Sequence, residues 1–343
     1  MSRRFRLGLV VGKFSPLHCG HEGLIRRAQS ACDNLLIVSY SNPELAGYAA
    51  DRRKAWLASQ FPQARRLVVT DELLRETVPT DSEFTTVPEN GASAATHRNF
   101  CGFLVETFVG TTVDAVFTSE DYGAGFAEHL TRRWSSPVEH VLVDRDRVEF
   151  PISGSQVRSD VHAHRNWLSP YVYSTFVQRI CLLGGESSGK SVLARAAAER
   201  FGTAFVPEYG RELWTAKGGQ LGYEDMLAIA KHQVEWEQSA ALRAVHSIFC
   251  DTSPLTTLFY SLDLFGRADP ELQTLALRTY DTYILCATDF EFVQDGTRRD
   301  AAFRQRQHDW YREQLANRGV DYLLATGSIE ARVDQIAARL VRP

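Results

Sequence analysis

Short apolar runs alternate with amphipathic segments along the chain, and the alternation occurs twice. In the first half, runs typical of buried strands cover residues 5–12, 34–40, 66–70, 114–119 and 138–144. In the second half, such runs cover residues 178–185, 203–208, 246–251, 282–287 and 320–327. Helical spacing lies between them, most clearly at residues 21–32, 191–202, 301–318 and 328–340. Strands that alternate with helices predict an α/β fold with two doubly wound parallel sheets.

The restart of this pattern near residue 178 indicates two domains, and 343 residues are more than one ordinary core needs. We place the boundary between residues 165 and 166. The connecting segment, residues 160–176, is aromatic and is not rich in glycine or serine. It therefore predicts a helical connector and not a flexible linker.

A ten-residue stretch, GKFSPLHCGH, joins the first predicted strand to the first predicted helix. It lies at the carboxyl end of a parallel strand and at a helix N-terminus, two places that favour anionic ligands. Gly12 and Gly20 would let the backbone approach a phosphate. Lys13 adds a charge, and His18 and His21, three residues apart, can direct their imidazoles at the same group. The stretch predicts a phosphate site.

A second segment, PISGSQVRSD at residues 151–160, supports the same site. It places Ser153 and Ser155 before a predicted helix and Arg158 three residues after Ser155. A serine at a helix start with an arginine in the first turn is another way to hold phosphate oxygens.

The second half contains GGESSGKS, which satisfies the P-loop pattern between an apolar strand and a helix. The loop backbone would cradle the β-phosphate, Lys190 would reach the β- and γ-phosphates, and Ser191 would bind Mg²⁺. The residues expected at this nucleotide are Gly184, Gly185, Ser187, Ser188, Gly189, Lys190 and Ser191.

Two acids end strands of the second half. Asp251 is placed to face a metal ion, or to cap the helix that follows it. Glu208 could accept the proton of an attacking hydroxyl, or form a surface salt bridge with Arg211.

The polar loop DGTRR and nearby aromatic residues extend this second site. Arg298 and Arg299 could close over the phosphates, or belong to a solvated run of charge. Phe292, Tyr209 and Trp214 could stack on an aromatic or cationic base, although aromatic side chains more often belong to the core.

Seven motifs, taken in order, resemble those of the NadR family. They are GKFSPLHCGH, TSEDYG (118–123), DRDRVEFPISGSQVR (144–158), GGESSGKS, PEYGRE (207–212), DTSPLTT (251–257) and VQDGTRR (293–299). The first motif and ISGSQVR also match the nucleotidylyltransferase signature. The resemblance covers nearly the whole chain. It implies a Rossmann-like nucleotidylyltransferase domain, residues 1–165, followed by a P-loop kinase domain, residues 166–343.

The resemblance implies two transferase activities, both with Mg²⁺. The kinase half would phosphorylate the 5′-hydroxyl of nicotinamide riboside with ATP. The other half would transfer AMP from ATP to nicotinamide mononucleotide, giving NAD and pyrophosphate.

The resemblance also implies which residues form the sites. The residues expected to act in catalysis are Lys13, His18, His21, Arg158, Lys190, Glu208 and Asp251. Those expected at ATP in the first domain are Gly12, Phe14, Gly20, Ser153 and Ser155, and those expected at the nicotinamide substrates are Tyr122, Tyr209, Arg211 and Phe292. Ser191 and Asp251 are the expected metal ligands.

The chain departs from the family pattern in three places. Some members begin with a DNA-binding helix-turn-helix, and here the first strand starts near Phe5, so we expect none. Ser155 stands where threonine is common, which keeps the hydroxyl. Ser253 stands where many members carry a second aspartate, which makes the metal site less certain.

The composition of the chain restricts the kinds of partner and the cellular compartment that we expect. The chain has 38 Lys and Arg against 42 Asp and Glu, a net charge of −4, which argues against a nucleic-acid partner. Its six cysteines form no CxxC pair, which favours a reducing cytoplasm. No apolar stretch is long enough to cross a membrane. A homo-oligomer is compatible with the sequence.

Two other functions fit the motifs. One is adenylyl or cytidylyl transfer to another phosphate, such as phosphopantetheine, fused to a different small-molecule kinase. The other is a regulator that senses bound ATP or NAD and whose turnover is incidental. The motifs specify the phosphate chemistry but leave the acceptor open.

Overall fold

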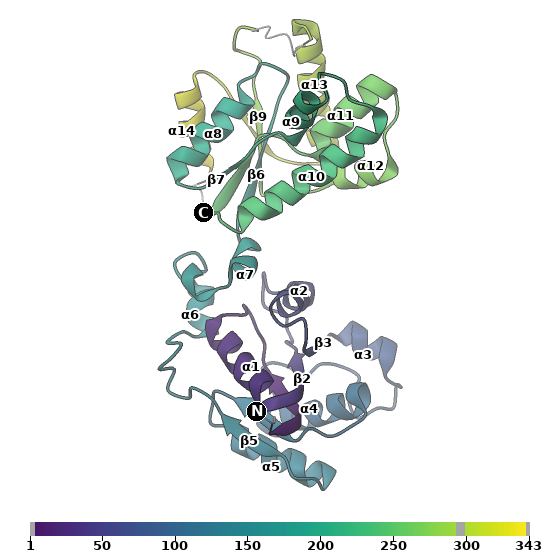
Figure 1. The fold of residues 1–343 in the computed structure, drawn as a ribbon, viewed down its shortest axis with the longest axis vertical. Helices are drawn as coiled ribbons and strands as arrows, with labels where there is room; N and C mark the ends of the chain where they lie inside the picture. Colours follow the sequence, from purple (N-terminus) through teal and green to yellow (C-terminus); the bar gives the residue numbers. More distant parts are fainter. Residues whose placement is uncertain (1–3, 293–298, 341–343) are drawn as a thin grey trace. The chain divides into compact units, whose positions relative to one another are not determined.

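The computed structural model of the chain describes residues 4–292 and 299–340. It divides into two compact units, Met1–Tyr173 and Ser174–Pro343. Each unit is a five-stranded parallel sheet with helices on both faces, which confirms the predicted α/β class (Figure 1). Every predicted strand is present.

The first sheet has the strand order β3-β2-β1-β4-β5. Its strands are β1 (Phe5–Val11), β2 (Cys32–Ser39), β3 (Arg65–Val68), β4 (Ala115–Thr118) and β5 (Glu139–Leu142). The helices are α1 (Cys19–Ala31), α2 (Ala50–Gln60), α3 (Asp71–Thr77), α4 (Ala94–Val109), α5 (Gly123–Trp134) and α6 (Gly154–Ser159). Chain order reverses between β1 and β4, and ligands bind beside such a reversal in doubly wound sheets.

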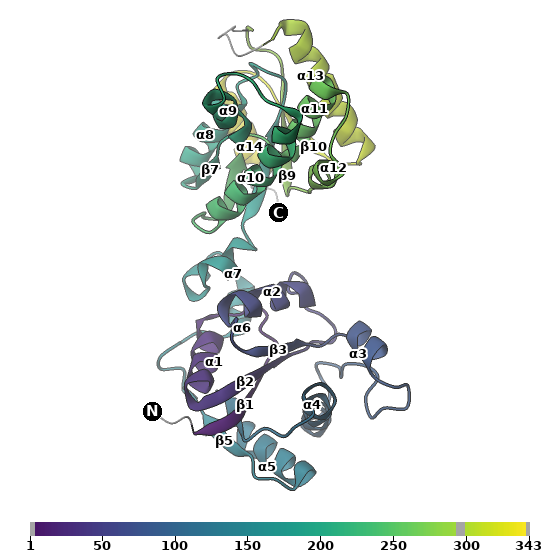
Figure 2. The same ribbon diagram turned by 45° about the vertical axis from the view of Figure 1, so that its right-hand side comes forward.

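Helices α4 and α5 pack on one face of this sheet, and α1 and α2 lie on the other (Figure 2). The first face buries Leu9 and Val116 of the strands against Phe100 of α4 and Leu130 of α5. Strands covered on both faces read as near-continuous apolar runs, which is why the sequence revealed them.

The second sheet has the order β10-β9-β6-β8-β7. Its strands are β6 (Gln178–Leu183), β7 (Ala204–Val206), β8 (Ser247–Cys250), β9 (Thr282–Cys286) and β10 (Tyr322–Ala325). The helices are α8 (Lys190–Phe201), α9 (Tyr209–Ala216), α10 (Tyr223–Ala241), α11 (Pro254–Phe265), α12 (Pro270–Ala276), α13 (Ala301–Asn317) and α14 (Ile329–Leu340). Helices α8 and α14 share one hydrophobic cluster with the central strands, and α10 and α12 share another (Figure 1).

The connecting segment is less helical than predicted. It contains a 3₁₀ turn, η1 (Arg165–Trp167), and a five-residue helix, α7 (Pro170–Ser174). The carboxylate of Asp160 accepts the backbone N–H groups of His162 and Ala163 and so forms a turn. Pro170 then starts α7, because proline is suited to the first turn of a helix.

Within residues 4–292 and 299–340, we find no helix that combines the length and the apolar character needed to cross a lipid bilayer.

Candidate active sites

The first cavity, about 230 Å³, lies where β1, β4 and β5 end and where α1 and α6 begin. The sequence-predicted residues that line it are Lys13, Phe14, His18, Gly20, His21, Ser153, Ser155 and Arg158. The fold therefore brings together two motifs that lie more than a hundred residues apart in the chain. Gly12 and Tyr122 are not among the lining residues.

The two histidines form the start of α1. His18 is the N-cap residue, and its backbone N–H donates to Nδ1 of His21 at 3.5 Å. The two rings stack with centroids 3.7 Å apart. Burial, and then the charges of Arg147 and Arg158, lower the pKa of His18 to about 4. Burial and then the neighbouring His18 hold the pKa of His21 well below its usual range. Near pH 7 both imidazoles are therefore neutral and can act as N–H donors.

The loop before α1 is shaped by Phe14. This residue has a φ of 48° and a ring that is 1% exposed. The ring meets the edge of His21, with centroids 5.1 Å apart. A Cβ on Gly12 would lie 2.9 Å from the same ring, so a side chain there would displace Phe14. The structure thus gives Gly12 a packing role beneath the loop.

Helix α6 belongs to the second motif, PISGSQVRSD, and its residues line the same cavity. Ser153 and Gln156 form a capping box, in which each accepts the other's backbone N–H. Arg158 donates through Nη1 to the carbonyl oxygen of Ser15 at 2.6 Å and through Nη2 to Oγ of Ser155 at 2.9 Å. Arg158 therefore links the two motifs directly. The serine-to-glutamine spacing is the signal that could have identified Gln156.

Arg147 also lines this cavity, and sequence reasoning missed it. It lies in the loop that Asp144 organises, since the Asp144 carboxylate accepts three backbone N–H groups, those of Val148, Glu149 and Phe150. The segment DRDRVEF was recognised as a motif, but nothing in its spacing distinguished Arg147 from Arg145. Arg145 pairs with Asp121 and does not line the cavity.

The second cavity, about 690 Å³, surrounds the P-loop. The sequence-predicted residues that line it are Ser187, Ser188, Gly189, Lys190, Ser191, Glu208, Arg211, Trp214 and Arg299. Gly184 and Gly185 belong to the loop but not to the lining. Gly184 has a φ of 145°, a conformation that residues with side chains rarely adopt. A Cβ on Gly185 would lie 2.4 Å from the backbone oxygen of Arg304.

Asp251 lies directly beside the P-loop helix. Its side chain is buried, and burial followed by the negative charge of Glu208 raises its pKa to about 7. The nearby hydroxyl of Ser191 opposes this rise in the pKa. Oδ1 of Asp251 has no hydrogen-bond partner among the described residues. Ser253, and not Asp251, is the N-cap residue of α11.

The pair formed by Ser191 and Asp251 fits a magnesium ion. Mg²⁺ favours oxygen ligands and is usually held by one or two carboxylates together with water and substrate phosphates. An unpartnered, buried carboxylate oxygen beside a hydroxyl supplies such ligands. A group of three or more His, Cys, Asp and Glu side chains suited to a metal does not occur within residues 4–292 and 299–340.

Glu208 follows β7 and lies at the N-cap position of α9. Its carboxylate lies 3.6 Å from Nε of Arg211, so the expected salt bridge is present. Both residues also line the second cavity, so the ion pair does not remove them from the site. The exposed fraction of the Glu208 side chain is 22%, which leaves it accessible to a ligand.

The P-loop also contacts Arg299, one of the two residues of the predicted lid. Glu186 accepts the backbone N–H of Arg299 at 2.9 Å, and Arg299 pairs through Nη1 with Asp263 at 2.5 Å. Glu186 accepts a further hydrogen bond from the hydroxyl of Tyr260 at 2.9 Å. Arg298 lies outside the described residues. Sequence reasoning missed Glu186 and Tyr260, which both line the second cavity.

Two predicted stacking residues do not line the second cavity. Tyr209 stacks on His232 with ring centroids 4.6 Å apart and meets the edge of Trp236, so its ring packs on α10. Phe292 lies beneath the guanidinium of Arg304, 5.4 Å from the ring centroid. Tyr122, predicted for the first site, is 44% exposed at the start of α5.

Comparisons with known proteins agree with this geometry. Residues 179–332, the unit that carries the P-loop, match the family described as AAA domain. The trifunctional NAD biosynthesis/regulator protein NadR of Salmonella typhimurium is 32% identical over 315 residues, which are 86% of this chain and 72% of that protein. The protein of the same name from Escherichia coli strain K12 is 32% identical over 311 residues, 85% of this chain and 71% of that protein.

The fold is also shared with solved structures. A crystal structure of a NadR protein in complex with NAD and AMP-PNP superposes with a TM-score of 0.69 over 97% of this chain and 96% of that one, at 18% identity. Another, in complex with NR, gives a TM-score of 0.70 over 100% of this chain and 98% of that one, also at 18% identity. The sequence identity over most of both chains and the two sheets agree: the chain belongs to the NadR family.

Proposed function

We propose that the chain makes NAD from nicotinamide riboside in two ATP-dependent steps, one in each unit. The second unit phosphorylates the riboside, and the first unit joins the resulting mononucleotide to AMP. The relatives are named for NAD biosynthesis, and the solved structures of NadR proteins carry NAD, AMP-PNP and NR. Each unit has a cavity lined by one of the two predicted phosphate-binding motifs, which supports a division of the two steps between them.

In the first unit, a phosphate oxygen of the mononucleotide attacks the α-phosphorus of ATP, and pyrophosphate leaves. Negative charge grows on the phosphate oxygens as the reaction proceeds. Lys13 and Arg158 supply positive charge beside the cavity, and His18 and His21 supply N–H donors at the start of α1. Donors held in place before the reaction stabilise this charge without reorganising, so catalysis rests on position and electrostatics.

In the second unit, the 5′-hydroxyl of the riboside attacks the γ-phosphorus of ATP, and ADP leaves. Glu208 is the carboxylate we assign as acceptor of the hydroxyl proton, since it lines the cavity that the P-loop opens into. Lys190 supplies charge to the β- and γ-phosphates. Ser191 and Asp251 would hold Mg²⁺, which neutralises phosphate charge when it is bound.

One observation carries the assignment of the first unit. Arg158 donates to the carbonyl oxygen of Ser15, 143 positions earlier, and so joins the two signature segments around one cavity. A chance match of either segment alone would not produce this contact. The six free cysteines and the acidic net charge further support a cytoplasmic enzyme that acts on small molecules without a nucleic-acid partner.

The test is incubation of the full chain with ATP, Mg²⁺ and nicotinamide riboside, with the mononucleotide and NAD followed over time by HPLC. We expect the mononucleotide to appear first and NAD to follow. A parallel reaction with phosphopantetheine as acceptor tests the alternative transferase. Adduct formation with phosphopantetheine and not with the mononucleotide would overturn the proposal, as would tight NAD binding without turnover.

A further inference from the structure

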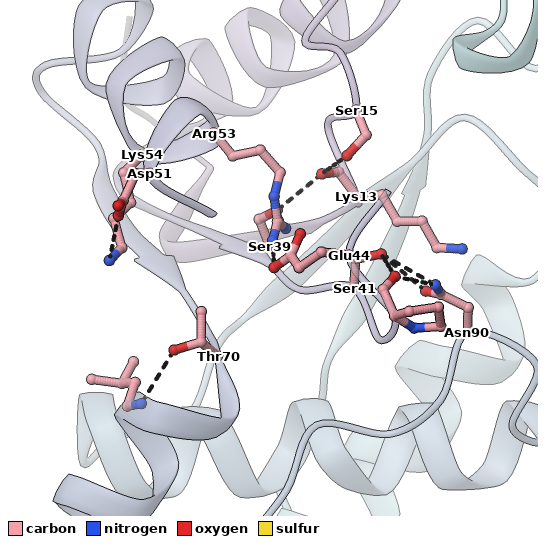
Figure 3. Close-up of polar contacts among 12 residues, drawn as sticks. Lys13, Ser15, Ser39, Ser41, Glu44, Asp51, Arg53, Lys54, Thr70 and Asn90 are labelled. Carbon is pink, nitrogen blue, oxygen red and sulfur yellow. Dashed lines mark hydrogen bonds and ion pairs between the residues drawn. The ribbon is translucent and has the colours of Figure 1, made fainter. Parts of the chain in front are cut away.

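A fully buried arginine lies behind the first cavity. Arg53, in α2, has a side chain that is 0% exposed. Its Nη1 donates to Oγ of Ser39 at 2.7 Å, and its Nη2 donates to a carboxylate oxygen of Glu44 at 2.5 Å (Figure 3). Arg53 is not among the residues that line the cavity. Because burying a guanidinium costs free energy even when it is paired, its place in the fold calls for an explanation.

Ser39 connects this arginine to the phosphate-binding loop. It is the last residue of β2, is 0% exposed, and donates through Oγ to the carbonyl oxygen of Lys13 at 3.1 Å. Ser15 donates to the same carbonyl, also at 3.1 Å. Figure 3 shows Arg53 reaching from α2 to Ser39, with Lys13 and Ser15 just beyond. A chain of hydrogen bonds thus runs from α2 to the backbone of the loop.

Arg53, which only donates, and the Lys13 carbonyl, which only accepts, together set the direction of this chain of hydrogen bonds. A guanidinium has donors only, whereas a serine hydroxyl has one proton and can donate or accept. With Arg53 donating to it, the Ser39 oxygen must accept, so its single proton is directed to the carbonyl of Lys13.

The loop depends on the hydrogen bond from Ser39 because the ladder between β1 and β2 ends where the loop begins. The ladder between β1 and β2 continues to Gly12, whose N–H donates to the carbonyl of Val38 at 3.0 Å. At the next residue, the Ser39 and Ser15 hydroxyls bond to the carbonyl of Lys13. That peptide group joins Lys13, which lines the cavity, to Phe14, which is left-handed and buried.

We propose that Arg53 is a positioning residue for the reaction of the first cavity, which acts through the Ser39 hydroxyl to orient the Lys13 peptide group. This inference rests on the proposed adenylyl transfer. A purely structural Arg53 would affect the melting temperature and leave the catalytic rate of the folded protein unchanged. A positioning Arg53 affects kcat more than KM, since a small displacement of a catalytic group slows the reaction.

The test compares Ser39→Ala, Arg53→Met and their double variant in the full chain, with kcat and KM measured for both activities. Lys54→Met is the matched control, because Lys54 is the next residue of α2, is exposed, and pairs only with Asp51 among the ion pairs of the described residues. We expect Ser39→Ala to lower kcat for adenylyl transfer by roughly ten- to a hundredfold. Riboside phosphorylation, at the other cavity, should keep its wild-type rate and serves as an internal control for folding.

The double variant should lose no more than the more damaging single variant, because both changes break one chain of hydrogen bonds. Arg53→Lys keeps a donor for Ser39 but loses the fork that also reaches Glu44, so its kcat should lie between those of wild type and Arg53→Met. If Arg53→Met does not fold, the kcat of Ser39→Ala still tests the inference, since this variant removes only one oxygen atom and should fold.

Three outcomes would contradict the inference. They are a wild-type kcat in Ser39→Ala, equal losses in the adenylyl transfer and kinase rates, and independent, additive losses in the double variant. Each of these leaves the proposed function standing, because wild type remains active. A wild-type chain without adenylyl transfer would overturn the proposed function itself and the inference with it.

Discussion

Arg332 donates through Nη1 to the backbone oxygen of Ser188 at 2.8 Å, across 144 positions of the chain. Arg332 is fully buried in α14, and Ser188 belongs to the P-loop. The same guanidinium bonds to the carbonyl of Ala287 and pairs with Asp289. Helix α14 therefore holds the P-loop in place through the side chain of Arg332.

We expect Arg332→Met to lower kcat/KM for riboside phosphorylation by about tenfold or more, because a displaced loop misplaces its donors. Adenylyl transfer in the same chain should be unchanged. Arg339→Met is the matched control, since Arg339 lies on the same helix and pairs with Asp321 near the surface. Removing the buried guanidinium of Arg332 also lowers stability, so rates are measured well below the melting temperature. Equal kinase rates in both variants would contradict the role of Arg332.

Lys190→Ala should abolish riboside phosphorylation and leave NAD synthesis from the mononucleotide largely intact. Its ammonium acts only on phosphates at the second cavity, where it is part of the lining. The measurement is HPLC of both products from separate starting substrates. A folded variant that had lost both activities would show that the two sites are not independent.

His21→Ala should stop adenylyl transfer and spare the kinase. We expect kcat to fall by roughly a hundredfold or more, and to fall more than KM rises, because the imbalance reports a contact made in the transition state. The measurement is steady-state kinetics with the mononucleotide and ATP. A histidine that only starts α1 would instead lower the melting temperature with little change in kcat.

The buried His18 predicts a pH dependence of stability. Its pKa is about 4 in the folded chain against an ordinary value of 6.5. Below pH 6.5 the unfolded chain therefore binds a proton that the folded chain does not, and the free energy of unfolding falls until about pH 4. At about 1.4 kcal/mol per pKa unit, the loss approaches roughly 3 kcal/mol. Calorimetric melting of wild type and His18→Asn between pH 4 and 8, values chosen to span this interval, should show the steeper decline in wild type. Parallel curves would count against a buried, neutral His18.

The α/β class could be predicted because strands covered on both faces leave apolar runs that need no other residues to interpret. The places of the two glycine-containing loops could be predicted for a similar reason, since each motif joins a strand to a helix within ten residues. The helix start was predicted only in part: Ser153 is the N-cap residue, but Ser155 lies inside α6 and Arg158 lies in its last turn, not its first.

What escaped prediction depends on contacts between distant segments. Arg53 stands in the run DRRK and Arg332 in an ordinary amphipathic helix, so both look like surface charges, yet both are fully buried. Nothing local indicates that a carbonyl or carboxylate from another segment will meet them. Tyr209 is the opposite case: the sequence allowed it to stack on a ligand, but its ring stacks on His232 and lies at 86° to Trp236.

Lys190 donates to the carbonyl oxygens of Gly184 and Gly185, at 2.9 and 3.0 Å. The loop that is shaped for phosphate thus carries its own counter-charge at the site. Ordering a lysine side chain costs about 1.5–2 kcal/mol of conformational entropy. Lys190 loses this entropy when the chain folds, and not when a nucleotide binds. An arriving nucleotide exchanges one set of lysine contacts for another and does not have to recruit a mobile cation from solvent. The charge of Lys190 is therefore already held at the loop before any nucleotide is bound.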